Sequence, residues 1–243
     1  MVGYPGVSMG HAHNHSQRVI DEQTASQLKA RFDAEMVRPI ELVMFKGVGN
    51  EEYSQWTEQL LRELDDLSDK IRVEIHDVTL EPELIEEFKV TKTPTILIDP
   101  RSGYRIRYTG APAGYEAWAF VETMILVSRD DSGLSDRVRE ILKEARNYGK
   151  EAHIMIFVTP TCPYCPNQVL LANKFAIELK GQIEADCVEA YENPDLADMF
   201  HVSAVPHNVI TVRDNGKEIP KEVSIGVQPE EKYAMDLIKA LRE

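Results

Sequence analysis

Residues 161–166 read Thr-Cys-Pro-Tyr-Cys-Pro, and the rest of the chain is best understood outward from this stretch. It follows a short apolar run at residues 153–158, which the pattern predicts as a buried strand. It precedes residues 167–179, in which apolar side chains recur at helical spacing. Two cysteines separated by two residues, in a turn between a strand and a helix, are typical of a redox-active dithiol.

The two cysteines are predicted to have different roles. Cys162 is expected at the N-cap of the following helix, with Pro163 as the first helical residue. Its sulfur would then lie over the free N–H groups of Tyr164 and Cys165 and over the positive end of the helix dipole, which favour thiolate over thiol. The thiolate is the nucleophile, so we predict that Cys162 attacks. Cys165 lies one helical turn further on, near enough to close a disulfide, and is predicted to be the resolving cysteine.

The alternative for such a cysteine pair is one half of a zinc site. Zinc normally takes four ligands, often from a second pair of this kind or from two histidines. The chain has one further cysteine, Cys187, and its cluster of histidines (His11, His13 and His15) lies in the N-terminal tail. Redox chemistry is therefore our first interpretation, and metal binding is the second.

Composition limits the kinds of partner. The chain has 243 residues, 43% of them hydrophobic and 28% charged, enough for two small domains with packed cores. Its formal net charge of −14 argues against nucleic acid and anionic membranes as partners. No apolar run approaches the length of a membrane span, and residues 1–20 lack the apolar core of a secretion signal. We therefore predict a cytoplasmic protein, in which a vicinal cysteine pair is typical of catalysis.

The chain contains an internal repeat. Phe45, in one predicted strand, lies 112 positions before Phe157 in another, and Pro94 lies 112 positions before Pro206. The five residues that end at each proline are also similar to each other. This repeat predicts two units of similar structure after a mobile tail, with the tail at residues 1–16 and the units at residues 17–128 and 129–243.

Each unit is predicted to have the order helix–strand–helix–strand–helix–strand–strand–helix, which gives a mixed β-sheet with helices on both faces. The strand, the Cys-Pro-Tyr-Cys turn and a Val-Pro pair 41 residues later resemble the thioredoxin and glutaredoxin fold. The doubled unit resembles the protein disulfide oxidoreductases of hyperthermophiles, glutaredoxin-like proteins with two thioredoxin-like units. The resemblance covers roughly residues 17–243. It implies an α/β fold made of two tandem thioredoxin-like units.

The resemblance also implies roles for residues around the dithiol. Pro206 and its equivalent Pro94 would follow cis peptide bonds, and the backbone of Val205 would pair with the substrate segment that forms a mixed disulfide. Tyr164 is expected to be exposed and to contact substrate, and Pro163 to help set the redox potential. Protein disulfides and dithiols would be the substrates. Electrons would come from a thioredoxin-reductase-like flavoenzyme, and no bound cofactor would be needed.

The first unit departs from the family pattern. The offset of 112 places Cys162 and Cys165 over Asn50 and Tyr53, so this unit has no dithiol and is predicted to be redox-silent. The asymmetry also resembles the N-terminal module of the flavoprotein reductase that serves bacterial peroxiredoxin. An electron-donor module between a flavoprotein reductase and a peroxiredoxin is therefore an alternative function. A non-catalytic metal-binding or scaffold module is another.

The base that assists Cys165 is left unassigned by the sequence. Thioredoxins place a buried aspartate six residues before the first cysteine, where this chain has Ile156. Asp186 and Glu189, on the neighbouring predicted strand, are weak candidates, because acids at a strand end are more often solvated. Cys187 lies on an apolar strand face and is interpreted as a core residue.

These observations together predict a thiol–disulfide oxidoreductase that reduces, forms or exchanges protein disulfides. In the reducing direction, the Cys162 thiolate attacks a substrate sulfur to form a mixed disulfide, and Cys165 then resolves it. The same steps in reverse oxidise a dithiol.

Overall fold

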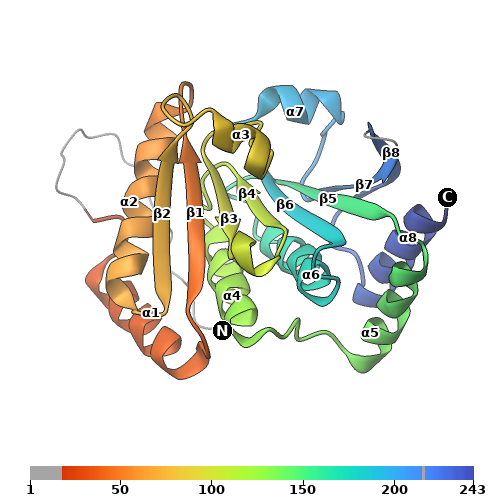
Figure 1. Ribbon diagram of the computed structural model, residues 1–243, viewed down its shortest axis with the longest axis horizontal. Helices are drawn as coiled ribbons and strands as arrows, with labels where there is room; N and C mark the ends of the chain where they lie inside the picture. The colour runs from red at the N-terminus through yellow and green to blue at the C-terminus, as the bar shows by residue number, and fades with distance from the viewer. Residues whose placement is uncertain (1–17, 215–216) are drawn as a thin grey trace.

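The structure is a computed structural model that describes residues 18–214 and 217–243. Its helices and strands run through nearly the same order twice (Figure 1). The first half contains α1 (Glu22–Glu35), β1 (Ile40–Lys46), α2 (Glu51–Leu67), β2 (Ile71–Asp77), α3 (Glu83–Phe88), β3 (Thr95–Ile98), the 3₁₀ turn η1 (Pro100–Ser102), β4 (Ile106–Thr109) and α4 (Glu116–Arg129). The second half contains α5 (Asp136–Lys143), the 3₁₀ turn η2 (Glu144–Asn147), β5 (Glu151–Val158), α6 (Cys165–Glu178), β6 (Ile183–Glu189), α7 (Pro194–Met199), β7 (His207–Asp214), β8 (Lys217–Ile225) and α8 (Glu230–Arg242).

The strands of the described residues form one eight-stranded sheet, in the order β2-β1-β3-β4-β6-β5-β7-β8. In each half the first strand pairs in parallel with the second and antiparallel with the third. The halves meet where β4 pairs in parallel with β6, with Tyr108 opposite Cys187. The predicted mixed sheet is therefore confirmed. The sequence did not predict that the sheets of the two halves join into one.

Helices cover the two faces of this sheet unequally (Figure 1). One face carries the main core, whose buried side chains come from the sheet and from six helices: Leu28 of α1, Leu61 of α2, Phe120 of α4, Leu142 of α5, Phe175 of α6 and Leu237 of α8. The other face has two small clusters, one under α3 around Phe45 and one under α7 around Phe157. Burial of each large apolar side chain contributes about 1.5–3 kcal/mol. The main core therefore dominates the stability of the fold.

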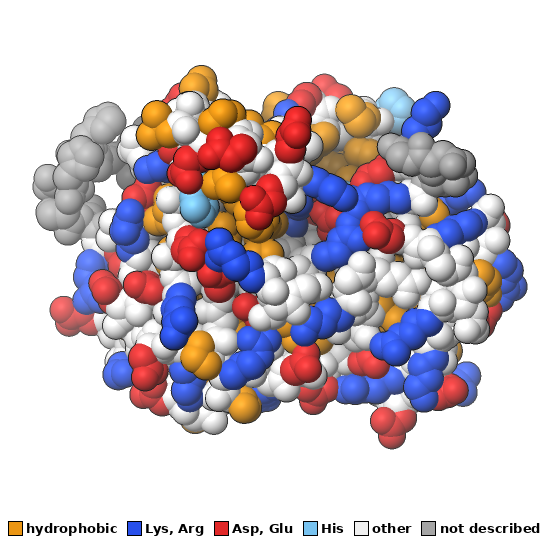
Figure 2. Space-filling view, in the orientation of Figure 1, with side chains coloured by type: hydrophobic (Ala, Val, Ile, Leu, Met, Phe, Trp, Pro, Cys, Tyr) orange, Lys and Arg blue, Asp and Glu red, His pale blue; other side chains and the backbone are white. Residues whose placement is uncertain are grey.

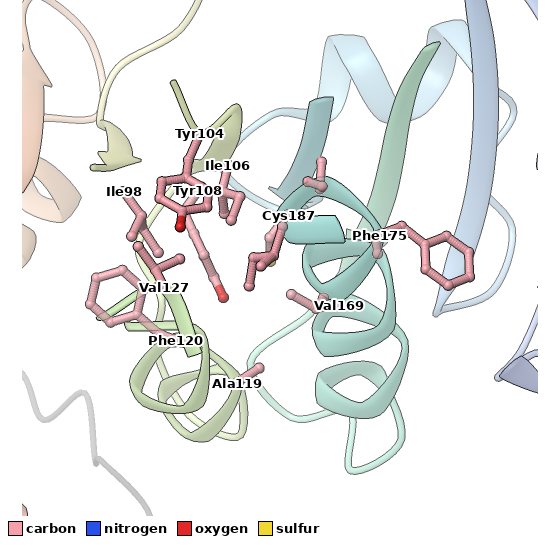
Figure 3. Packing of buried hydrophobic residues seen from close by; sticks show 14 of the residues in the cluster. Ile98, Tyr104, Ile106, Tyr108, Ala119, Phe120, Val127, Val169, Phe175 and Cys187 are labelled. Carbon is pink, nitrogen blue, oxygen red and sulfur yellow. The ribbon is translucent and has the colours of Figure 1, made fainter. Parts of the chain in front are cut away.

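The two halves share this core where α4 packs against α6 (Figure 3). Ala119 is fully buried in α4, and the Phe120 ring lies edge-on to the Tyr108 ring at 5.0 Å between centroids. Asn173 of α6 donates hydrogen bonds to the Tyr108 hydroxyl at 3.2 Å and to Thr123 Oγ1 of α4 at 2.9 Å. Hydrogen bonds of this kind between buried polar groups fix how two elements pack. The position of α4 relative to α6 is therefore well determined.

Ion pairs cross the same junction on the opposite face of the sheet. Arg105 and Arg107 of the first half contact the buried Glu184 of β6 at 2.9 and 3.2 Å. The three side chains line part of a groove of about 350 Å³ beside α3, which is visible as a hollow in Figure 2. Because both guanidinium groups are already paired with carboxylates, the groove is not a ready-made anion site.

Three further sequence predictions concern the N-terminal tail, the boundary between the two units, and membrane spans. The N-terminal tail, with its three histidines, lies outside the described residues. The predicted boundary between the units, at residues 128 and 129, falls at the end of α4. Among the helices of the described residues, none combines the length and apolar composition that a membrane-spanning helix requires.

Candidate active site

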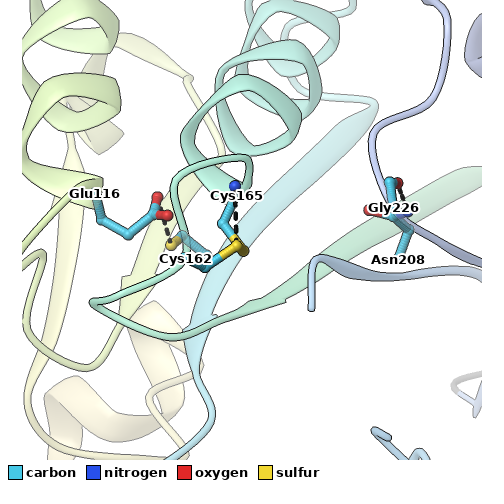
Figure 4. The surroundings of a disulfide bond; sticks show 6 residues. Glu116, Cys162, Cys165, Asn208 and Gly226 are labelled. Carbon is cyan, nitrogen blue, oxygen red and sulfur yellow. Dashed lines mark hydrogen bonds between the residues drawn. A yellow bond between two sulfur atoms is a disulfide. The ribbon is translucent and has the colours of Figure 1, made fainter. Parts of the chain in front are cut away.

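The two cysteines lie where β5 leads into α6, and they form a disulfide (Figure 4). The S–S distance is 2.15 Å and the Cα–Cα distance 5.5 Å. The predicted strand at residues 153–158 is β5, which begins two residues earlier, at Glu151. The predicted helix at residues 167–179 is α6, which begins at Cys165 and ends at Glu178. The strand–turn–helix context predicted for the dithiol is therefore confirmed.

The N-cap prediction for Cys162 is wrong in detail. Tyr164 occupies the N-cap position and Cys165 is the first helical residue, so Pro163 lies outside the helix. Pro166 supplies the proline in the first turn instead. Cys162 Sγ nevertheless accepts a hydrogen bond from the Cys165 backbone N–H at 3.2 Å. Of the two N–H groups expected to reach the sulfur, those of Tyr164 and Cys165, the one of Cys165 therefore does so.

The two cysteines of the disulfide differ in solvent accessibility. Cys162 is 8% exposed, whereas Cys165 is 0% exposed. A partner sulfur can therefore approach Cys162 but not Cys165. This difference favours the predicted order, in which Cys162 attacks and Cys165 resolves. Tyr164, between them, is 67% exposed, as predicted.

The difference in accessibility gives a direct prediction for the reduced protein. Limiting iodoacetamide at neutral pH is expected to alkylate Cys162 well before Cys165 or Cys187, because Cys162 is the most accessible of the three sulfurs. Peptide mapping by mass spectrometry would measure the order. Earlier labelling of Cys165 would contradict the assignment of Cys162 as the attacking residue.

Both predicted cis prolines are confirmed: the Thr93–Pro94 and Val205–Pro206 peptide bonds are cis. His207, which follows Pro206, pairs with Phe157 near the end of β5. Val205 and Pro206 therefore lie at the edge of the sheet from which β5 enters the disulfide turn. Val205 lies outside the helices and strands. Within the described residues, neither its N–H nor its C=O forms a hydrogen bond with another backbone group. Its backbone is open to pairing with another chain.

The corresponding place in the first half is closed. Asn50, which stands at the position of Cys162, donates from its side-chain amide to the Thr93 carbonyl at 3.2 Å and to the Glu192 carbonyl at 3.1 Å. Thr93 is the residue before the cis proline in this half. The Thr93 carbonyl therefore accepts a hydrogen bond from Asn50, whereas the Val205 carbonyl accepts no backbone hydrogen bond within the described residues. The first half lacks the thiols, and it also lacks an open backbone beside the cis proline.

The two acids that the sequence offered as weak candidates for the base are not solvated. Asp186 and Glu189 are both buried, and the expectation that they are solvated is wrong. Asp186 faces the α7 side of the sheet, where it accepts a hydrogen bond from the Thr109 hydroxyl at 2.9 Å. Glu189 Oε2 accepts the Glu192 backbone N–H at 2.6 Å, and burial raises the pKa of Glu189. The pairing of β4 with β6 buries this strand end, which a single strand pattern does not reveal.

A different carboxyl group approaches the disulfide. Glu116, the first residue of α4, is 2% exposed, and its side chain points toward the cysteines (Figure 4). Its Oε2 lies 3.8 Å from Cys187 Sγ, and within the described residues its Oε1 has no hydrogen-bond partner. Burial raises the pKa of Glu116 to about 8, although the Cys187 contact acts in the opposite direction. A carboxyl with this pKa exchanges its proton near neutral pH.

Cys187 is buried and free, as the core interpretation predicted. It pairs across the sheet with Ile156, the residue that replaces the thioredoxin aspartate. Glu116 thus reaches, from the first half of the chain, the neighbourhood that the missing aspartate would occupy. In the sequence Glu116 is an ordinary acid at a helix start, where the dipole favours carboxylates, so no local signal marked it. Within the described residues, no group of three or more His, Cys, Asp or Glu side chains is placed to hold a metal ion.

A disulfide between the end of a strand and the start of a helix, beside a cis proline, defines a thioredoxin-fold redox protein. Residues 152–232 match the thioredoxin domain family. A thioredoxin of Methanocaldococcus jannaschii is 33% identical over 57 residues, which are 24% of this chain and 67% of that protein.

Solved structures extend the likeness to both halves. A protein disulfide oxidoreductase from Aeropyrum pernix has a TM-score of 0.77 and 32% identity, over 91% of this chain and 94% of that one. An alkylhydroperoxide reductase (AhpF) from Enterococcus faecalis has a TM-score of 0.74 over 90% of this chain and 99% of that one, but at 23% identity it shows the fold alone. The chain belongs to the protein disulfide oxidoreductase family of the thioredoxin fold, with two thioredoxin-like units in tandem.

Proposed function

We propose that this protein reduces, forms or exchanges disulfides of other proteins through Cys162 and Cys165. The observation that carries the proposal is the disulfide itself, with a partly exposed Cys162 beside a fully buried Cys165. An open Val205 backbone at the same edge of the sheet supports a polypeptide substrate, since an extended chain can pair with it. The predicted chemistry needs no bound cofactor, because the dithiol carries both electrons.

The reduction runs in two exchange steps. The Cys162 thiolate attacks one sulfur of the substrate disulfide; a new S–S bond forms, the substrate bond breaks, and the departing thiolate takes up a proton. The Cys165 thiol then loses its proton and attacks Cys162 Sγ. The second substrate sulfur leaves, and the Cys162–Cys165 disulfide is restored. Two electrons pass from the dithiol to the substrate, and the reverse sequence oxidises a substrate dithiol.

We assign the proton transfer at Cys165 to Glu116. The buried Cys165 thiol has to lose its proton before it can attack, and water has little access to it. The Glu116 carboxyl points toward the disulfide, has one oxygen without a partner among the described residues, and has a pKa of about 8. These properties suit a group that accepts the proton during resolution and returns it in the reverse direction.

A second candidate function is an electron-donor module. The single dithiol in the second half favours it, because a relay between two redox proteins needs only one dithiol. In this role a thioredoxin-reductase-like flavoenzyme would reduce the disulfide and a peroxiredoxin would receive the electrons. A cytoplasmic location is consistent with both functions and stays a prediction.

The proposal is tested by the reduction of insulin disulfides in the presence of dithiothreitol. The wild-type protein is expected to accelerate insulin precipitation, and Cys187→Ala is expected to do so as well, since this thiol is outside the dithiol. A non-catalytic scaffold would produce no acceleration. Stoichiometric zinc in the purified reduced protein would favour the metal-binding alternative. Turnover of a peroxiredoxin with a flavoprotein reductase, in the absence of insulin activity, would favour the relay.

A further inference from the structure

The loop before α4 joins the first half of the chain to the disulfide turn. The Tyr115 backbone N–H donates to the Pro160 carbonyl at 3.0 Å, two residues before Cys162. The preceding residue, Gly114, has a φ of +63°, and a Cβ added there would lie 2.2 Å from the Pro160 oxygen. Only glycine permits so close an approach of the two backbones. The position of Tyr115 beside the disulfide turn is therefore fixed by the fold.

The Tyr115 ring, in contrast to its backbone, is free. It is 55% exposed, and within the described residues its hydroxyl has no hydrogen-bond partner. Two other tyrosines near this edge are also exposed: Tyr164, between the cysteines, and Tyr191, which is 70% exposed. Tyr191 follows Ala190, whose N–H bonds the carbonyl of Val158 at the end of β5. We call Tyr115, Tyr164 and Tyr191 the tyrosine rim.

The small exposure of Cys162 makes this rim important. Disulfide exchange requires the attacking sulfur to contact the substrate sulfur directly. Since only 8% of Cys162 is exposed, a substrate disulfide reaches it only when the flanking chain lies against the surrounding surface. Tyrosine offers a large apolar face with a polar tip and loses little side-chain entropy on contact, which is why it is common at binding hot spots.

We propose that Tyr115 determines specificity for protein substrates, although it belongs to the half of the chain that has no cysteines. Its ring packs on an apolar or aromatic side chain of an extended polypeptide, next to the cysteine that reacts with Cys162. The occupant is a polypeptide because the open backbone of Val205 lies at the same edge and pairs with a chain. This inference rests on the proposed disulfide exchange.

The test compares two substrates in the full-length protein. One is a peptide disulfide with a phenylalanine beside each cysteine, and the other is the small disulfide 5,5′-dithiobis(2-nitrobenzoate). Tyr115→Ala is expected to raise KM for the peptide about tenfold, the size of a contact worth about 1.4 kcal/mol, while kcat and the small-disulfide rate stay unchanged. Tyr115→Phe, which keeps the ring, is expected to remain close to wild type.

Val37→Ala is the matched control, because Val37 is also exposed and precedes β1. It therefore lies at the end of the sheet opposite to the disulfide turn. It is expected to change neither rate. Unchanged peptide KM in Tyr115→Ala would overturn the inference, and so would an equal loss on both substrates, which would indicate disturbance of the disulfide turn. Failure of the wild-type protein to reduce either disulfide is a different result: it would refute the proposed function and this inference with it.

Discussion

Cys162→Ser is expected to abolish disulfide reduction, whereas Cys165→Ser is expected to stop at a mixed disulfide with substrate. The serine hydroxyl cannot displace a sulfur, so without Cys162 no covalent intermediate forms. Without Cys165 the first exchange still occurs, but the thiol that resolves the mixed disulfide is missing. Insulin reduction measures the first effect. Non-reducing electrophoresis with mass spectrometry measures the second.

The same pair of variants also checks the order of attack. Both serine variants keep the size of the side chain, and Cys187→Ala serves as a control that leaves the dithiol intact. A mixed disulfide trapped by Cys162→Ser instead would show that Cys165 is the attacking residue. That outcome would contradict the assignment from exposure, since Cys165 is fully buried.

Glu116→Gln is expected to slow resolution by about a hundredfold at pH 8 and above, within the range typical of general acid–base catalysis. In the wild type, resolution should accelerate as pH rises through about 8, because the Glu116 carboxylate that accepts the proton forms there. The glutamine variant should lack this inflection, and the two proteins should converge toward pH 6, where Glu116 is protonated. Single-turnover release of a substrate thiol from the mixed disulfide measures both.

Asp186→Asn is the control for this prediction, since Asp186 is a buried carboxyl on the other face of the sheet. It is expected to leave the inflection near pH 8 in place. An inflection that survives in Glu116→Gln and disappears in Asp186→Asn would transfer the proton acceptor to Asp186.

Stability provides a readout of Glu116 that does not depend on turnover. Its pKa is raised from 4.5 to about 8 in the folded protein, so between these values the folded state binds more protons than the unfolded state. Its contribution to stability is therefore fully present below pH 4.5 and is lost as pH rises toward 8. Glu116→Gln should show a smaller loss of unfolding free energy over this range, measured by urea denaturation at fixed pH values.

Local patterns in the sequence were sufficient for the dithiol and the fold of each half. The apolar run before Cys162 and the helical spacing after Cys165 set β5 and α6, because strand and helix periodicity depend on neighbouring residues. The repeat predicted two similar units and identified Asn50 at the position of Cys162. The cis bonds before Pro94 and Pro206 were implied by the resemblance to the thioredoxin and glutaredoxin fold, and the structure confirms them. Apart from the cis bonds, these predictions needed only residues close in sequence or the offset between the repeats.

Tertiary structure alone decided how the two halves cooperate. The pairing of β4 with β6 joins two sheet edges whose apolar patterns do not name their partner, and it buries Asp186 and Glu189. It also brings Glu116 to Cys187 across 71 positions of sequence and fixes Tyr115 beside the disulfide turn. The sequence determines what each element is, because that depends on short-range periodicity. Which side chains meet near the disulfide depends on how whole elements pack. No local sequence pattern marks Glu116 or Tyr115 as one of them.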